Sequence, residues 1–286
     1  DALPILKKIS RRSFLAAAAV SAAALALTAC GGSASTASSA AASSVAASSE
    51  AASTSAAAAE LTTVEAGKLT MATNATFPPY EMTTDAGTIE GIDVDTAQAI
   101  AEKLGLELQI DDMDFDAALL SVQQGKADIA MAGITVTDER MAVMSFSDSY
   151  ATGIQSVIVP EGSDIASVDD LAGKKIGTQR GTTGYLYCSD DFGEDAVVAY
   201  DNGLTAVQAL NNGQVDAVVI DNEPAKAYVE SNPGLKILDT SYAEEDYAIG
   251  MAKDNTALLE AVNAALEELK ADGTLQAIVD KYIKAE

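Results

Sequence analysis

Short apolar runs alternate with amphipathic stretches from about Leu61 to the C-terminus of this 286-residue chain. The apolar runs predict strands at Leu69–Ala72, Glu107–Ile110, Ile129–Ala132, Ser156–Val159, Lys175–Gly177, Ala196–Tyr200, Ala217–Ile220 and Tyr247–Ala252. Apolar positions that recur every three or four residues predict helices at Asp95–Leu104, Ala117–Gln124, Leu204–Asn211 and Thr256–Asp272. Strands that alternate with helices are typical of α/β folds, so we expect largely parallel sheets.

One unit of this pattern occurs twice. Residues 117–133 and 205–221 each consist of a helical stretch, a glycine, two residues, an aspartate and an apolar strand, at an offset of 88 residues. The glycines, Gly125 and Gly213, suit helix C-caps. A helix, a glycine and a strand in succession are common in α/β proteins, but the repeat favours two lobes. Each lobe would offer loops at the carboxyl ends of its strands, where open α/β sheets bind ligands.

The two repeated strands end in complementary chemistry. The first is followed by Gly133, Thr135 and Arg140, and the second ends at Asp221. Glycine allows close approach of the backbone, and a guanidinium matches a carboxylate with two hydrogen bonds. Arg140 on one lobe and Asp221 on the other would suit the two ends of a zwitterion. The alternatives are a surface ion pair between Arg140 and its acidic neighbours, and a helix N-cap at Asp221.

Composition excludes several classes of function. The net charge of −26 argues against nucleic acid or anionic lipid as the partner. The absence of histidine excludes His-based triads, His-ligated zinc and His proton shuttles. We expect no cofactor and no metal site.

Two local features have simple structural interpretations. The acidic run Asp111, Asp112, Asp114 and Asp116 lacks the glycine and distal glutamate of a calcium loop, which favours a solvated loop. With Cys30 assigned to a lipid anchor, as argued below, Cys188 is a lone thiol that we expect to pack as a small hydrophobic residue.

The first sixty residues predict export and anchoring. A basic region and the apolar stretch Phe14–Leu27 end in Leu27-Thr28-Ala29-Cys30, which resembles a bacterial lipobox and implies a signal peptide over residues 1–30 with lipidation of Cys30. Arg11 and Arg12 also allow twin-arginine export. Residues 31–64 are rich in Ala and Ser, and we expect a disordered tether there.

Several motifs from residue 66 onward resemble the polar amino-acid solute-binding proteins of ABC importers. They are Asn74-Ala75-Thr76-Phe77-Pro78-Pro79-Tyr80-Glu81, Gly91-Ile92-Asp93-Val94-Asp95, Ala132–Arg140, Gly181-Thr182-Thr183-Gly184, Val219-Ile220-Asp221-Asn222 and Ala271-Asp272-Gly273-Thr274. Each is weak alone, but their order along the chain is specific. Thr96 departs from the apolar residue usual in relatives after the second motif, which we interpret as a packing variation.

The resemblance implies a two-lobed periplasmic-binding-protein-like fold of type II, with a mostly parallel sheet flanked by helices in each lobe. Lobe 1 would comprise residues 65–154 and 247–286, and lobe 2 residues 155–246. Two hinge crossovers would lie near Ile154–Pro160 and Glu245–Lys253.

The family also implies roles for particular residues. Arg140, helped by Thr183, would hold the ligand's α-carboxylate, and Asp221 would hold its α-ammonium. The whole implied ligand-binding set is Asn74, Phe77, Phe115, Ala132, Gly133, Thr135, Arg140, Gln179, Thr182, Thr183 and Asp221. Phe77 and Phe115 could instead be ordinary core residues. Asn74 stands where some relatives place a carboxylate, which favours a neutral polar ligand.

The resemblance implies a lipid-anchored monomer on the outer face of a bacterial membrane. This protein would bind a free amino acid without turnover and deliver it to the permease of an ABC importer. An exported dehydratase acting on arogenate or prephenate is the enzyme alternative, with Asp221 and Glu223 as the candidate acids near the cleft. A sensory domain is disfavoured because no signalling segment follows Glu286.

Overall fold

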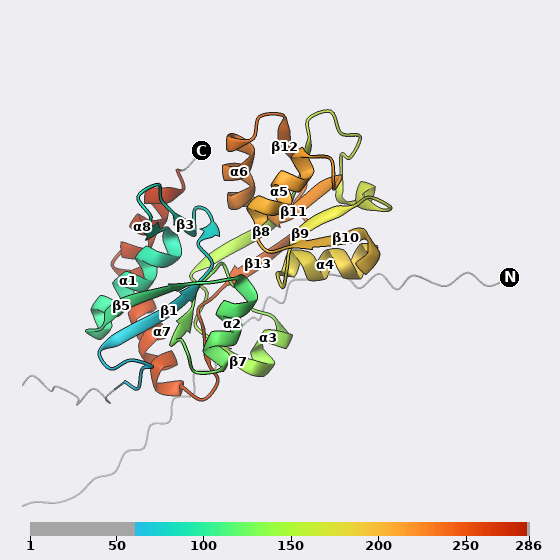
Figure 1. The fold of residues 1–286 in the computed structure, drawn as a ribbon. Coiled ribbons are helices and arrows are strands. Elements are labelled where there is room, and N and C mark those ends of the chain that lie inside the picture. Colours follow the sequence, from blue (N-terminus) through green and yellow to red (C-terminus); the bar gives the residue numbers. More distant parts are fainter. Residues whose placement is uncertain (1–60, 285–286) are drawn as a thin grey trace, which may run out of the picture. The chain divides into compact units, whose positions relative to one another are not determined.

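The computed structural model describes residues 61–284, in which two β-sheets and the helices packed on them form two lobes (Figure 1). The first lobe is built on a five-stranded sheet of order β5-β1-β6-β14-β7. Its strands are β1 (Lys68–Thr73), β5 (Glu107–Asp112), β6 (Ile129–Ala130), β7 (Met144–Phe146) and β14 (Gly250–Ala252). Strand β1 runs parallel to β5 and β6, whereas β14 runs antiparallel to β6 and β7.

The second lobe is built on a six-stranded sheet of order β10-β9-β11-β8-β12, with β13 also paired to β8. Its strands are β8 (Ala151–Pro160), β9 (Ile176–Gln179), β10 (Val197–Tyr200), β11 (Ala217–Asp221), β12 (Leu235–Ile237) and β13 (Ala243–Tyr247). Strand β9 is parallel to β10 and β11, but β8 is antiparallel to all its partners. Both sheets are therefore mixed, which corrects the expectation of mostly parallel sheets.

Helices cover both faces of each sheet. The helices are α1 (Ile92–Leu104), α2 (Phe115–Gln123), α3 (Asp138–Val143), α4 (Thr183–Phe192), α5 (Gly203–Asn211), α6 (Asn222–Ser231), α7 (Thr256–Ala271) and α8 (Thr274–Tyr282), with 3₁₀ turns at Val168–Leu171 and Glu194–Ala196. A small sheet of β2 (Thr76–Phe77), β3 (Glu81–Thr83) and β4 (Ile89–Glu90) lies between β1 and α1 in the chain. Phe77 and Ile89 pack on the same core as α1, so this sheet belongs to the first lobe.

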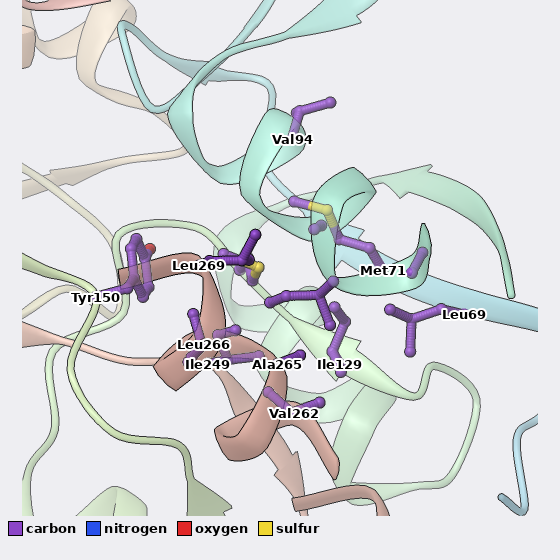
Figure 2. Packing of buried hydrophobic residues seen from close by; sticks show 14 of the residues in the cluster. Leu69, Met71, Val94, Ile129, Tyr150, Ile249, Val262, Ala265, Leu266 and Leu269 are labelled. Carbon is purple, nitrogen blue, oxygen red and sulfur yellow. The ribbon is translucent and has the colours of Figure 1, made fainter. Parts of the chain in front are cut away.

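Alternating side chains of the buried strands supply the cores. Leu69 and Met71 of β1 pack with α1 and α7, whereas Ala72 packs with α2 on the opposite face of the sheet. Figure 2 shows the first of these clusters, where Leu69, Met71 and Ile129 meet residues of α7 such as Leu266. Successive residues of a strand point to opposite faces, so one strand serves two helical layers.

The chain crosses between the lobes twice. It leaves the first sheet after β7 and enters the second at β8, so the first crossing lies at residues 147–150, earlier than predicted. It returns through residues 248–249, between β13 and β14, which splits the predicted strand Tyr247–Ala252. The two crossing segments lie side by side, because the Ser147 amide donates to the Ile249 carbonyl and the Ile249 amide donates to the Ser147 hydroxyl. They form the hinge that the fold class requires.

Several local expectations need correction or extension. Asp111 and Asp112 belong to strand β5, and Asp112 accepts a hydrogen bond from the Ala75 amide, so this run is not a solvated loop throughout. Cys188 is buried in the core of the second lobe, as expected. Val64 donates its amide to Asp128, which ties the start of the described residues to the first lobe. The signal peptide, Cys30 and most of the predicted tether lie outside the described residues.

Candidate functional site

A cavity of about 450 Å³, including the part open to solvent, lies where strand ends of the two lobes meet. The residues after β1 and β6 approach it from the first lobe, and the ends of β9 and β11 approach it from the second. All eleven predicted ligand-binding residues line the cavity: Asn74, Phe77, Phe115, Ala132, Gly133, Thr135, Arg140, Gln179, Thr182, Thr183 and Asp221. The fold therefore brings the whole predicted set together.

Arg140 is held at the cavity by both lobes. It lies in α3, whose N-cap Thr137 accepts a hydrogen bond from the Arg140 amide. Its guanidinium donates to the Thr135 carbonyl at 2.7 Å and, across the cleft, to the Gly181 carbonyl at 3.1 Å. The guanidinium carbon lies 5.3 Å from the centre of the Phe115 ring. Burial lowers the pKa of Arg140 but leaves it a cation, so this is a fixed positive charge and not a surface ion pair.

Asp221 both caps a helix and faces the cavity. Its carboxylate accepts hydrogen bonds from the amides of Glu223 and Ile154 and from the hydroxyl of Tyr247, at 2.8–3.0 Å. The Glu223 bond is the N-cap of α6, so the predicted capping role and the predicted cavity position occur together. Burial raises the pKa of Asp221 to about 6, although the three hydrogen bonds oppose that shift.

A second buried carboxyl group, which sequence reasoning did not select, also lines the cavity. Glu81 of β3 is fully buried, and within residues 61–284 no N–H or O–H group donates to either of its oxygens. Behind it lies Asp93, which accepts hydrogen bonds from the Gly133 amide and the Tyr150 hydroxyl. Burial, reinforced by Asp93, raises the pKa of Glu81 well above its usual range. Burial also raises the pKa of Asp93 to about 6.

The Gly133 contact with Asp93 refines one expectation. Because the Gly133 amide already donates to Asp93, this residue can offer a ligand only its carbonyl and a close approach of the backbone. That approach is tight: a Cβ at Gly133 would lie 2.7 Å from the Phe77 ring.

Polar side chains bridge the lobes around the cavity. Gln179 donates to the side chain of Asn74 at 3.0 Å, and the hydroxyl oxygens of Thr135 and Thr183 lie 3.5 Å apart. Glu245, in β13 at the hinge, accepts hydrogen bonds from Thr135 of the first lobe and Gln155 of the second. The cavity wall is therefore tied directly to the hinge.

The remaining lining residues are Glu81, Gln155, Val219, Ile220 and Tyr247, none of which sequence reasoning chose. Glu81 stood inside a quoted motif, and Gln155 and Tyr247 lay in the predicted crossings. Their positions in the sequence only weakly indicated a place on the cavity wall, because the spacing does not determine which side of each strand faces the cavity.

Within the described residues, no group of three or more His, Cys, Asp or Glu side chains could hold a metal ion. None of the helices in that part of the chain is long and apolar enough to cross a membrane. The site therefore consists of a fixed cation and buried carboxyl groups on facing lobes, beside aromatic rings. This arrangement defines the class of two-lobed proteins that enclose a small charged solute.

Comparison with known proteins agrees with this class. Residues 69–285 match the bacterial extracellular solute-binding proteins, family 3, and the chain belongs to that family. ABC transporter arginine-binding protein 1 of Escherichia coli (strain K12) is 33% identical over 76% of this chain and 91% of its own length.

Two solved structures of an ancestral arginine-binding protein are similar to this chain. The structure bound to arginine has a TM-score of 0.73 and 43% identity, covering 76% of this chain and 98% of the other. The structure bound to glutamine has a TM-score of 0.73 and 41% identity, covering 77% of this chain and 100% of the other. The chain is the extracytoplasmic amino-acid-binding component of an ABC importer and not an enzyme, and its relatives bind free amino acids.

Proposed function

We propose that the ligand is a free amino acid with a cationic side chain, for which arginine is the best match. The observation that carries this proposal is Glu81, a fully buried carboxyl group on the cavity wall that receives no hydrogen bond from the described residues. Its neighbour Asp93 is also a carboxyl group, which can share a proton with Glu81 but cannot neutralise its charge. An ionised Glu81 without a donor is therefore strongly unfavourable. A guanidinium, with several donors in one plane, satisfies such a group better than a neutral amide does.

The charge balance of the cavity supports the same ligand. Glu81 and Asp221 line it, and Glu245 and Asp93 are bonded to lining residues. Among residues 61–284, Arg140 is the one basic residue that lines it. A zwitterion adds one charge of each sign and leaves this excess of carboxyl groups unchanged. A cationic side chain adds the missing positive charge, which departs from the neutral ligand that Asn74 favoured at the sequence level. Relatives described as arginine-binding support the choice.

The other site residues take the roles that the family implies. Arg140 and Thr183 hold the α-carboxylate and Asp221 the α-ammonium; each charge-assisted hydrogen bond is worth about 1.5–3 kcal/mol. Phe77 and Phe115 pack on the ligand side chain and exclude water from these bonds. Backbone and hydroxyl groups complete the enclosure, from Asn74, Ala132, Gly133, Thr135, Gln179 and Thr182.

Isothermal titration of the ligand-stripped protein with the twenty amino acids and cystine tests the proposal, with Glu81→Gln as the diagnostic variant. We expect Glu81→Gln to weaken arginine binding by roughly 10- to 100-fold and to leave glutamine binding unchanged or improved. Glu90→Gln, a carboxylate in β4 of the same small sheet outside the cavity, is the matched control. Equal loss of both ligands in Glu81→Gln would contradict the assignment.

Proton release gives an independent signature. Burial and Asp93 raise the pKa of Glu81 well above its usual range, and a cation bound beside the carboxyl group would lower that pKa and favour release of a proton. Arginine would displace that proton and glutamine would not. Calorimetry in buffers of different ionisation enthalpy measures the difference. If neither arginine nor glutamine releases a proton on binding, this would count against a cation at Glu81.

Lipid anchoring extends the proposal to residues outside the described structure. The lipobox supports cleavage before Cys30, attachment to the outer face of the cell membrane and a monomeric receptor on a tether over residues 31–64. Labelling with a radioactive fatty acid should mark the wild type and not Cys30→Ser. Labelling of both proteins would exclude Cys30 as the lipidation site.

A further inference from the structure

Within residues 61–284, a hydrogen bond joins the two lobes away from both the cavity and the hinge. Tyr228 lies in α6 of the second lobe and is 6% exposed, and its hydroxyl donates to the backbone carbonyl of Thr76 in β2. Strand β2 belongs to the small sheet of the first lobe. Tyr228 is absent from the residues that line the cavity, so this contact between lobes needs no ligand atom.

The polar contacts between the lobes at the cavity have a different character. The bonds from Gln179 to Asn74 and from Arg140 to Gly181, like the Thr135–Thr183 contact, involve side chains on the cavity wall. A ligand in the cavity competes for or reorganises those groups. The Tyr228 hydroxyl does not line the cavity, so a ligand there does not compete for it.

Packing around Tyr228 reinforces the contact. Phe77, next to Thr76, packs against the cores of both lobes. A Cβ at Gly203 would clash with the Ile220 side chain and lie 3.1 Å from the Tyr228 ring, so a glycine at the start of α5 makes room for both side chains. Asp221 is the N-cap of the helix that carries Tyr228, so the proposed ammonium site and the contact share one rigid element.

We propose that Tyr228 is a positioning residue that favours the closed arrangement of the lobes and so sets ligand affinity without touching the ligand. The proposal rests on the proposed function only in assuming that the cavity is the ligand site. Apparent affinity scales with the population of the binding-competent state, so a bond present only in the closed state strengthens the binding of every ligand by the same factor.

Tyr228→Phe removes the hydroxyl and keeps the ring. Tyr242→Phe is the matched control, because the Tyr242 hydroxyl donates to Asp191 inside the second lobe. Tyr242 is similarly buried, at 7% exposed. We expect Tyr228→Phe to weaken arginine and glutamine binding by the same factor, roughly 3- to 10-fold, with their ratio unchanged. Tyr242→Phe should leave both affinities within twofold of the wild type.

Hydrogen exchange followed by mass spectrometry supplies the readout that a merely structural role would not change. Without ligand, peptides covering residues 74–82 and 176–186 should exchange faster in Tyr228→Phe than in the wild type, and at saturating ligand they should exchange equally. Wild-type affinity and wild-type exchange in Tyr228→Phe would overturn the proposal, as would an equal effect of Tyr242→Phe. If the wild type does not bind arginine, the ligand proposal fails, while the exchange comparison without ligand still tests Tyr228.

Discussion

The two copies of the helix–strand unit share one scaffold and end in opposite chemistry. Helix α2 and helix α5 are both nine residues long, and they begin 88 residues apart, as do β6 and β11. The glycines after the helices, Gly125 and Gly213, have φ values of 66° and 67°. Each unit therefore has the same helix, the same left-handed turn and the same strand position.

The aspartates of the two units accept equivalent backbone hydrogen bonds. Asp128 accepts a hydrogen bond from the Thr70 amide of β1, and Asp216 accepts one from the Lys175 amide immediately before β9. In both cases the carboxylate links the repeated strand to its parallel neighbour. These repeated carboxylates hold the scaffold and do not reach the cavity.

The difference lies at the carboxyl ends of the strands. Strand β6 stops at Ala130, and the chain turns at Gly133, with φ of 54°, toward Arg140. Strand β11 continues to the equivalent position, where Asp221 places a carboxylate at the cavity. A duplicated framework thus presents a cation from one lobe and an anion from the other.

The largest effect is expected from removing the cation of the first copy. Arg140→Ala should weaken ligand binding by more than about 3 kcal/mol, or over 100-fold, because two charge-assisted bonds to the carboxylate disappear. Calorimetry measures the loss. Arg180→Ala is the control, since Arg180 pairs with Asp201 at 3.6 Å, is 58% exposed and does not line the main cavity. Normal binding by Arg140→Ala would refute the proposed clamp.

The next test concerns the turn that ends the first strand. Gly133→Ala should lower the free energy of unfolding by about 2–3 kcal/mol, since a left-handed backbone disfavours a side chain and the new Cβ would lie 2.7 Å from Phe77. Ligand binding should weaken with it. Gly125→Ala, left-handed but with nothing within 4 Å, should cost about 1 kcal/mol and leave binding intact. Urea unfolding compares them, and equal costs would contradict the close approach.

The paired aspartates should differ in cost because they differ in burial. Asp128 is 4% exposed and accepts two backbone N–H groups, whereas Asp216 is exposed and accepts one. Asp128→Ala should therefore lower the free energy of unfolding by about 2 kcal/mol and Asp216→Ala by about 1 kcal/mol, both without changing ligand affinity. Thermal or urea unfolding measures this. A change in affinity would mean that the scaffold and the site are not separable.

The smallest effect is a pH dependence located in the second copy. Only the ionised Asp221 attracts an ammonium group, and burial raises its pKa to about 6. Protonation as the pH falls through 6 should therefore weaken binding, by about tenfold from pH 7 to pH 5. A ligand with a neutral side chain isolates this step from Glu81. Asp221→Asn should bind weakly with a flat profile; a flat profile in the wild type would contradict the role of Asp221.

Much of the fold could be predicted because it is encoded locally. The apolar runs located β1, β5, β9, β10 and β11, and helical periodicity located α1, α2, α5 and α7. Helices α4 and α8 were not predicted, and α6 was expected only in the alternative that Asp221 caps a helix. Helix α6 has a proline near its start and few apolar residues, as loops do. Antiparallel pairing of β8 and β14 was also missed, since strand direction depends on where the chain crosses between lobes and not on residue type.

The candidate site could likewise be predicted only in part from the sequence. The sequence by itself determined which residue types follow each strand, and hence that a guanidinium and a carboxylate would meet at one edge of the α/β sheets. Only the tertiary structure decided that the Glu81 and Asp93 carboxyl groups lie together beside the cavity and that the Gly133 amide donates to Asp93. It also decided that the Tyr228 hydroxyl donates to the Thr76 carbonyl across the cleft. The physical reason is that spacing along the chain sets where a strand ends. Burial and pairing arise between segments far apart in sequence, whose approach is fixed only when both lobes pack.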